Sequence, residues 1–398
     1  MTIRFLLMSM LCATLIHLAF AITYPIVDTG QAVCFDNDRQ IVPPAFGQPF
    51  YGQDAQYYGN QPAYHDNGDG TITDLVTGLM WVKARGEKVT FAEARVSATR
   101  CRVGGYTDWR MPTIKELYSL MLFTGYSRRT VEESRPYIDN RYFEFTYGDT
   151  VHGERLIDCQ DWTSTQYLGT TMNGNATVFG VNFADGRIKG YPRNNGISGP
   201  HRLYVRYVRG NPSYGKNDFH DNGDGTISDR ATGLMWEQTD SGIGMDWAAA
   251  LAWVQARNAE KYLGYTDWRL PNAKELHSIV DYTHAPSVTH SPAIDPIFQT
   301  TQLANGEFPY YWTSTTHQDG PPERQAIEAV YIVFGRALGW MALPPNFQLR
   351  LLDVHGAGAQ RSDPKSGNPE AYPHGRGPQG DDIRINNFVR CVRDEAKP

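Results

Sequence analysis

The hexapeptide DNGDGT occurs twice and places three aspartates around each of two glycine-rich turns. These are Asp66, Asp69 and Asp74 in the first turn and Asp221, Asp224 and Asp229 in the second. Calcium takes about six to eight oxygen ligands, and EF-hand-like loops arrange them around a glycine at the sixth position. Aligning Gly70 there puts His65 first and Val76 twelfth, where an acidic residue belongs. A hairpin built on NG and DG is therefore favoured, with calcium as the alternative.

A second candidate is the stretch 351–382, within an insertion of residues 342–382 that is rich in glycine and proline. Its candidate ligand-binding residues are Asp353, His355, Gln360, Arg361, Asp363 and His374. Long segments without regular structure are either disordered or functional. We favour this loop as the recognition site, with Arg361 holding an anionic or hydroxyl-rich ligand through its planar guanidinium. The alternatives are a flexible loop without a ligand and a zinc site from His355, His374 and an aspartate, whose spacing fits no standard pattern.

The sequences DWTST (161–165) and YWTST (311–315) supply hydroxyl groups at corresponding places. Ser164 and Ser314 could line a sugar pocket. Hydrogen-bonded turn residues are the favoured alternative.

Four motifs recur in the same order in both halves of the chain: the DNGDGT stretch, GYTDWR, WTST and a closing strand. This order indicates a duplicated domain, not a short-period repeat. The predicted organisation is a signal peptide at 1–21, an N-terminal extension at 22–63, a first domain at 64–210, a linker at 211–218 and a second domain at 219–398. The wider spacing before the last motif places the insertion in the second copy.

Each copy is predicted to carry two helices among short strands. Thr90 and Glu93 form a capping box ahead of the first helix, and the counterpart in the second copy starts at Asp246. The second helix begins near Pro112 or Pro271, because proline fits the first helical position. Two helices followed by a run of strands make an α+β domain.

Other shared residues are predicted to be structural. The core anchors are Trp81, Trp109, Trp236 and Trp268, which stand in apolar settings. Arg110 and Arg269 each precede a helix start, and Glu116 and Glu275 follow six residues later. A buried Arg–Glu pair that ties loop to helix is favoured over a ligand clamp.

Taken together, DNGDGTxxDxxTGLMW, GYTDWRxPxxKEL, WTST and the closing VRxVR-like strand resemble the Lcl C-terminal domain family. This bacterial domain of unknown function is named for the end domain of a collagen-like adhesin. The resemblance covers about residues 64–210 and 219–394. It implies a C-type-lectin-like fold, with two helices and small antiparallel sheets in each copy. Members often pair a cysteine before GYTDWR with one in the closing strand. Here copy one has Cys101, but Tyr207 stands in its closing strand. Copy two has Cys391 in its closing strand but no cysteine at 246–265. Neither copy therefore carries both cysteines of the usual pair.

The N-terminus and the cysteine content favour export. Residues 1–21 resemble a secretory signal peptide cleaved before Ile22, so the expected location is the periplasm, the cell surface or the outside. No later run is long and apolar enough for a transmembrane segment. The four remaining cysteines suggest two disulfides in an oxidising compartment, with Cys101 to Cys159 slightly favoured. They are Cys34, Cys101, Cys159 and Cys391.

The predicted function is an exported, non-enzymatic binding or adhesin-like protein that recognises an extracellular glycan or a surface protein. Without Arg4 the chain has 36 basic residues (37 minus one) against 43 acidic, which argues against nucleic-acid binding. Only a local cluster such as Arg187, Lys189 and Arg193 could attract sulfated glycans. Calcium is the one candidate cofactor. The alternatives are a structural or assembly protein of the cell surface and an enzyme related to the formylglycine-generating sulfatase-modifying enzymes. Those enzymes need a copper-binding cysteine pair that this sequence does not supply.

Overall fold

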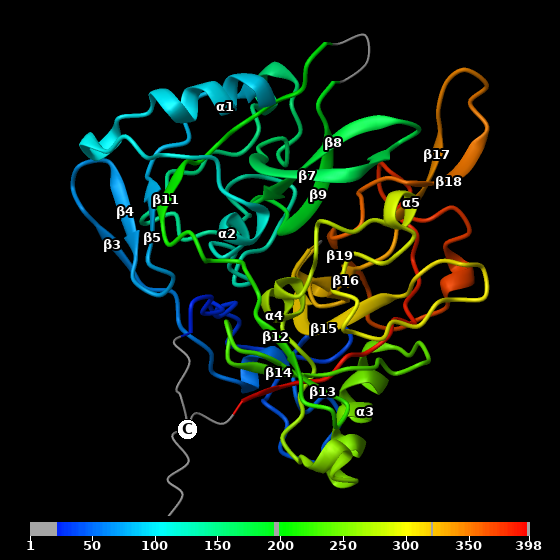
Figure 1. Ribbon diagram of the computed structural model, residues 1–398. Helices are drawn as coiled ribbons and strands as arrows, with labels where there is room; N and C mark the ends of the chain where they lie inside the picture. The colour runs from blue at the N-terminus through cyan, green and yellow to red at the C-terminus, as the bar shows by residue number, and fades with distance from the viewer. Residues whose placement is uncertain (1–21, 195–198, 320, 396–398) are drawn as a thin grey trace, which may run out of the picture.

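The computed structural model of the protein describes residues 22–194, 199–319 and 321–395 (Figure 1). The expected signal peptide at 1–21 lies outside these residues. The α-helices are α1 (Phe91–Arg100), α2 (Ile114–Tyr118), α3 (Trp247–Ala259), α4 (Ala273–Ser278) and α5 (Pro286–Thr289). No helix within the described ranges is long and apolar enough to cross a membrane. We call residues 64–210 copy one and residues 219–394 copy two.

The strands are short and mostly antiparallel. The N-terminal extension holds β1 (Cys34–Phe35) and β2 (Gln40–Ile41). Copy one holds β3 (Tyr64–Asp66), β4 (Thr71–Asp74), β5 (Leu79–Val82), β6 (Val89–Thr90), β7 (Asp161–Thr171), β8 (Asn175–Asn182), β9 (Arg187–Pro192), β10 (Arg202–Leu203) and β11 (Val208–Gly210). Copy two holds β12 (Phe219–Asp221), β13 (Thr226–Asp229), β14 (Leu234–Glu237), β15 (Tyr310–His317), β16 (Glu328–Val333), β17 (Leu338–Ala342), β18 (Leu349–Asp353), β19 (Gln360–Pro364) and β20 (Val392–Asp394). Few helices among small antiparallel sheets make each copy α+β.

Each copy opens with the same four-stranded sheet. The orders β11-β5-β4-β3 and β12-β13-β14-β20 place the closing strand of each copy beside its LMW strand. Trp81 lies opposite Val208 and Trp236 opposite Val392, and both tryptophans are fully buried. The first and last motifs of a copy therefore meet in one sheet, which closes the copy on itself.

The helix starts agree with the predicted caps. Thr90 and Glu93 form a capping box at α1, and the Asp246 side chain caps α3 by accepting from the backbone N–H of Ala249. The second helix of each copy, α2 or α4, starts two residues later than expected and also has a capping box, Thr113 with Glu116 or Asn272 with Glu275.

The shared tryptophans and Arg–Glu pairs are structural. Trp109 and Trp268 are 4% and 1% exposed, and each indole N–H donates to the carbonyl of a preceding residue, Val103 or Tyr262. Arg110 binds Glu116 through both terminal nitrogens, at 2.6 and 2.5 Å. Arg269 binds Glu275 at 2.5 Å and Asp394 at 2.7 Å. Each pair ties the loop after GYTDW to the next helix, and the predicted burial holds in copy two only, since the Arg110 side chain is 37% exposed.

The two copies share one sheet, although the sequence suggested separate domains. Its strand order is β15-β16-β19-β9-β8-β7, and β9 of copy one meets β19 of copy two at the residue pair Ile188 and Gln360. The strands on either side of this junction correspond in the two copies, so the copies are related by an approximate twofold axis. A reciprocal contact confirms it: Lys115 Nζ donates to Ser278 O at 2.7 Å, and Lys274 Nζ donates to Ser119 O at 2.8 Å. Helices α2 and α4 therefore meet across the same axis.

The insertion of copy two is not one long loop over 342–382, and this expectation is corrected. Residues 360–364 form β19, the counterpart of β9, because they pair with β16 as β9 pairs with β8. The extra residues instead fall on both sides of β19. Before it they form the β17–β18 hairpin, which projects from the body in Figure 1. The polar pattern 351–382 reflects a buried strand between two connections.

The N-terminal extension lies mainly on copy two. It leaves the body at Asp28 and returns at Gly59, whose backbone N–H donates to Asp28 Oδ2 at 2.8 Å. Asp28 N also donates to Asn60 O at 2.7 Å. These contacts between Asp28 and residues 59–60 form the neck of a loop. We call the loop, residues 29–58, the excursion. Lys365, which directly follows β19, donates from Nζ to Asp36 O of the excursion at 2.8 Å. This hydrogen bond joins the excursion to copy two.

The two expected disulfides do not form. All four described cysteines, Cys34, Cys101, Cys159 and Cys391, are free thiols. They lie on separate elements: in β1, just after α1, just before β7 and just before β20. Burial raises the pKa of the Cys34 thiol, and that of Cys391 lies well above its usual value for the same reason. Buried, protonated thiols of this kind behave as small apolar core residues.

Candidate functional site: a polar cleft between the two copies

Two adjoining cavities of about 480 and 570 Å³ lie where the copies meet. They share Arg155, Gln160, Lys189, Tyr191 and Gln379 as lining residues. Strand β9 contributes Arg187, Lys189 and Tyr191, which point to one face because side chains alternate along a strand. Copy two contributes Glu328 from β16 and Arg361 from β19. The junction of the shared sheet therefore sets the position of these side chains.

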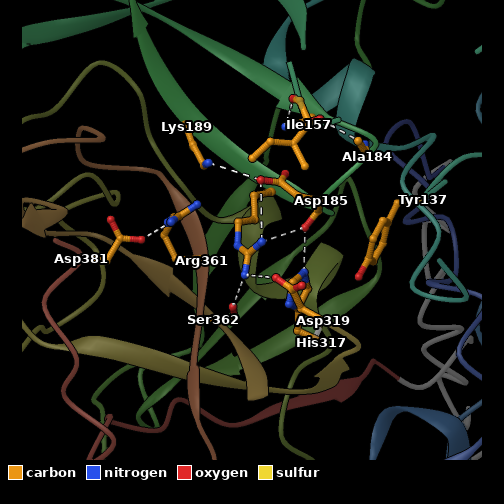
Figure 2. A network of polar contacts seen from close by, with 12 residues as sticks. Tyr137, Ile157, Ala184, Asp185, Lys189, His317, Asp319, Arg361, Ser362 and Asp381 are labelled. Carbon is orange, nitrogen blue, oxygen red and sulfur yellow. Dashed lines mark hydrogen bonds and ion pairs between the residues drawn. The ribbon is translucent and has the colours of Figure 1, made fainter. Parts of the chain in front are cut away.

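The Arg187 guanidinium contacts three polar side chains of copy two, of which Asp319 and Ser362 are labelled in Figure 2. It lies 2.9 Å from Asp319 Oδ2 and 3.5 Å from Glu328 Oε2, and it donates to Ser362 Oγ at 3.0 Å. Ser362 Oγ in turn donates to Glu328 Oε2 at 2.5 Å. Burial opposes ionisation of Glu328, but His317, Arg376 and Arg187 together hold its pKa well below its usual range.

A metal could be considered at His317, Asp319 and Glu328. One ligand atom from each lies within 4.8 Å of the others, the only such group within the described ranges. His317 Nε2 is 2.8 Å from the backbone oxygen of Asp185, and Tyr137 stacks on the His317 ring at 5.6 Å. The two carboxylates, however, already face the Arg187 guanidinium. An internal arginine thus supplies the positive charge there, and a metal would have to displace it.

Arg361 and His355 converge on Asp381. Arg361 Nη2 donates to Asp381 Oδ2, and His355 Nε2 lies 2.7 Å from Asp381 Oδ1. Burial would raise the pKa of Asp381, but Arg361 and His355 hold it well below its usual range. Burial lowers the pKa of His355 to about 4, because Asp381 only partly offsets the loss of water. At neutral pH the cluster is therefore an arginine–aspartate pair beside a neutral imidazole.

Lys189 is a further basic residue of the cavity lining. Its Nζ lies 3.3 Å from Asp185 Oδ2, and burial lowers its pKa to about 8 (Figure 2). The 480 Å³ cavity is lined by six basic side chains and four acidic ones. The basic residues are Arg155, Arg187, Lys189, Arg324, Arg361 and Arg376, and the acidic ones are Asp185, Asp319, Glu328 and Asp381. On a chain that is acidic overall, this lining has an excess of positive charge.

Several buried polar atoms of this lining have no hydrogen-bond partner among the described residues. They are Nε and Nη1 of Arg361, Nε of Arg187, Oδ1 of Asp185 and the hydroxyl of Tyr191. Buried polar groups are nearly always paired with protein, water or ligand. A cavity whose lining has excess positive charge is suited to an anionic, hydroxyl-bearing molecule.

The residues predicted as ligand-binding in the insertion fall into two groups, those that line the cleft and those that do not. Arg361 and His355 reach the cleft, whereas Asp353, Gln360 and Asp363 are buried within the fold. Asp353 accepts from Tyr167 Oη at 2.7 Å, and burial raises its pKa to about 6. Asp363 accepts from the backbone N–H groups of 384 and 385, and burial raises its pKa to about 7. These carboxyls anchor connections and do not face the cleft.

The zinc alternative is wrong for the described part of the chain. His374 is exposed and its ring packs against Trp340 at 5.6 Å, while His355 is buried against Asp381. No group of metal-ligating side chains in the described ranges includes either histidine.

The aspartates of the DNGDGT turns bind their own loops. Asp66, Asp69 and Asp74 accept from the backbone N–H groups of residues 68, 71 and 76, at 3.0, 3.0 and 2.9 Å. In copy two Asp221, Asp224 and Asp229 accept in the same way from residues 223, 226 and 231. The favoured hairpin is present. Within the described residues, neither triplet gathers into a group that could hold a metal. Calcium binding at these turns stays a prediction.

The two WTST serines differ in exposure. Ser164 is exposed, whereas Ser314 is 1% exposed. Their backbone contacts are the same, because Ser164 N donates to Pro112 O and Ser314 N donates to Pro271 O. The difference arises outside the motif, from the excursion that covers copy two.

Sequence reasoning missed most of the acidic partners in the cleft. Asp185 lies in a β-turn of copy one, and Asp319 and Glu328 lie around a loop of copy two, so no motif links them. One signal was present: the alternation of Arg187, Lys189 and Tyr191 predicts one charged strand face. What this face meets depends on the sheet junction, which no local pattern shows.

Comparison with known proteins gives one match. The model of the Lcl C-terminal domain matches twice, at residues 70–209 and 225–342. No curated protein and no solved structure matches the chain. The two matched stretches fall within the two copies that the repeated motifs indicated.

Proposed function

Because the chain belongs to the Lcl C-terminal domain family and carries two copies of that domain, we propose that it is an exported, non-enzymatic binding protein. Its ligand is an acidic glycan, held in the cleft between the copies. This is a lectin-like function in which the protein's own guanidinium groups recognise the ligand. The observation that carries the proposal is the excess of positive charge in the lining of the 480 Å³ cavity, six basic side chains against four acidic ones.

The chemistry of the cleft favours a carboxylate or sulfate group beside hydroxyls. Guanidinium groups bind planar anions through two parallel hydrogen bonds. Gln160 and Gln379 line both cavities and can meet sugar hydroxyls. The long-range charge of an acidic chain disfavours polyanions in general, so selectivity here would rest on the fit of a short acidic segment in the cleft.

The test is a glycan array that contains uronic-acid, sulfated and neutral oligosaccharides, probed with and without calcium. Acidic glycans are expected to bind in both conditions, because the cations of the cleft belong to the protein. Arg324→Ala, which removes an exposed lining arginine, should weaken binding by about tenfold, the loss of one charge-assisted contact.

Arg350→Ala is the matched control, since Arg350 is exposed on β18 and does not line either cavity. It should bind as the unchanged protein does. Equal loss in both variants would place recognition outside the cleft. Mass spectrometry of the recovered oligosaccharide should show no change in mass, and any cleavage or transfer product would contradict the non-enzymatic proposal.

A further inference from the structure

A separate groove of about 800 Å³ lies on copy one, away from the polar cleft. Helices α1 and α2, the start of β7 and linker residues 212–216 form its walls, and residues 280–282 of copy two form the far side. The WTST hydroxyls Ser164 and Thr165 lie within it.

The corresponding surface of copy two is covered by the excursion. Asp54 lies there and accepts from Thr315 Oγ1 at 2.5 Å, and Gln31 pairs with Thr316 through two hydrogen bonds at 2.8 and 2.9 Å. Phe50 packs on Trp247 of α3 at 6.3 Å. In copy two, therefore, the surface that corresponds to the open groove of copy one is occupied by an extended segment that carries a carboxyl group.

Each of the main contacts has an open equivalent in copy one. Thr315 accepts from the first backbone N–H of α4 and Thr165 from that of α2, both at 3.0 Å, which leaves each hydroxyl hydrogen free to donate. Thr315 donates to Asp54, while Thr165 has no acceptor among the described residues. Arg269 is 8% exposed beneath Tyr57, and its counterpart Arg110 is 37% exposed.

A backbone edge is also open. Phe123 N donates to Thr29 O of the excursion at 2.8 Å, and Phe123 O accepts from Gln31 Nε2 at 3.3 Å. The corresponding residue across the twofold axis is Tyr282, which lines the groove of copy one. Its backbone N–H and C=O have no hydrogen-bond partner in the described part of the chain. An extended segment in this groove would pair with them, as strand additions do.

The linker explains why only one groove is filled. Tyr24 and Tyr214 pack together at 4.6 Å, and they precede the two copies on opposite sides of the axis. Lys274 reaches Asp28 O at 3.0 Å, and Lys115 reaches Asn217 Oδ1 at 2.8 Å. After Asp28 the chain makes the excursion, whereas the linker runs directly into copy two.

The charge of the groove points to the kind of occupant. Its basic residues are Arg95, Arg110, Lys115 and Lys216, against Glu116 and Asp281. Glu116 is bound by Arg110, and Asp281 accepts from Thr283 and lies 3.0 Å from His284. Arg95 and Lys216 are exposed at the rim. The groove is therefore suited to an acidic segment.

We propose that the groove of copy one binds an extended, acidic peptide segment of a partner protein. A carboxylate of that segment accepts from Thr165, and its main chain pairs with Tyr282. This inference does not depend on the glycan proposal, because the two sites share no lining residue.

The test selects peptides from a random linear phage library on the full chain. Enriched peptides are expected to share an aspartate or glutamate, and a synthetic copy should lose about tenfold in affinity when its carboxylate is replaced by the amide. Arg95→Glu should weaken the same peptide by a similar factor. Arg100→Glu is the matched control, since it reverses an exposed charge on the same helix outside the groove and should leave binding unchanged.

Two further measurements keep the outcome decisive. Ser164→Trp, which fills the groove from an exposed position, should abolish peptide binding while thermal melts show a folded protein. Failure to enrich peptides, or binding that survives Ser164→Trp, would overturn the proposal. Light scattering tests the competing occupant: a dimer that Ser164→Trp dissolves would show that the groove takes the excursion of a second copy and no partner peptide.

Discussion

At the scale of single residues, buried ionisable groups join the parts of the chain. Asp54 accepts from Thr29 Oγ1 at 2.8 Å and from Thr315 Oγ1 at 2.5 Å, so one carboxyl links the excursion to copy two. Burial raises its pKa to about 7 in the folded chain. Lys274 lies in the same region, and burial lowers its pKa to about 7. Both groups favour the uncharged form.

The Asp54 carboxyl predicts a pH dependence of stability. Because its folded-state pKa is raised from 3.8 to about 7, its contribution to stability is fully present below the unfolded pKa and is lost as pH rises through about 7. Asp54→Asn keeps an acceptor for both hydroxyls and should remove this decline. Denaturant melts should therefore favour the variant more at pH 8 than at pH 5. Asp38→Asn, an exposed carboxyl of the same segment, should show no such trend, and parallel curves for Asp54→Asn would disprove the assignment.

The tryptophans and the Arg–Glu pairs could be predicted from the sequence, because the tryptophans stand in apolar settings and each glutamate follows its arginine by six residues. The surroundings of Arg361 could not be. Its partner Asp381 is 20 residues away across a connection, and Lys189 comes from the other copy. The sequence did indicate that Arg361 would meet anions, but a buried aspartate already occupies one side of its guanidinium.

At the scale of elements, the excursion decides which of two similar grooves is open. The caps, helices and hairpins of both copies follow local rules that the sequence shows. The excursion has no such pattern, since β1, β2 and one short 3-10 helix are its only regular elements in the described chain. Its place depends on side chains such as Gln31, which bonds to residues far away in sequence.

Replacing residues 29–58 by a short Gly-Ser link should uncover copy two without unfolding it. The neck at Asp28 and Gly59 already holds the ends together, so loop closure changes little. Thiol labelling, mapped by mass spectrometry, reports the result: Ser314→Cys should be protected in the full chain and reactive in the shortened one. Ser164→Cys should react in both, and early labelling of Ser314→Cys in the full chain would contradict the covered groove.

At the scale of the whole molecule, the two copies are joined by contacts that cross their boundary, and we expect them to unfold as one cooperative unit. The shared sheet, the Lys115 and Lys274 contacts and the excursion all cross the boundary between them. Sequence analysis located the duplication correctly and treated the copies as separate, because strand pairing between copies leaves no local signature. The junction at Ile188 and Gln360 involves two residues outside every repeated motif.

Calorimetry tests whether the two copies unfold in a single transition. Trp109→Ala and Trp268→Ala should each cost about 3–5 kcal/mol, from lost burial and the cavity that remains. Both variants are expected to lower the temperature of the same single transition, although one lies in each copy. Two transitions, of which each variant moves only one, would show that the copies unfold independently.

The excursion also orders the assembly of the molecule in time. A chain is synthesised from its N-terminus, so residues 29–58 exist before either groove does. Copy one is completed next, and the groove that stays open in the finished protein gains its far side when residues 280–282 of copy two are made. The Gln31 contact to Thr316 spans 285 residues and the Lys365 contact to Asp36 spans 329, so neither can form until copy two is nearly complete. The segment made first is thus among the last to reach its final place.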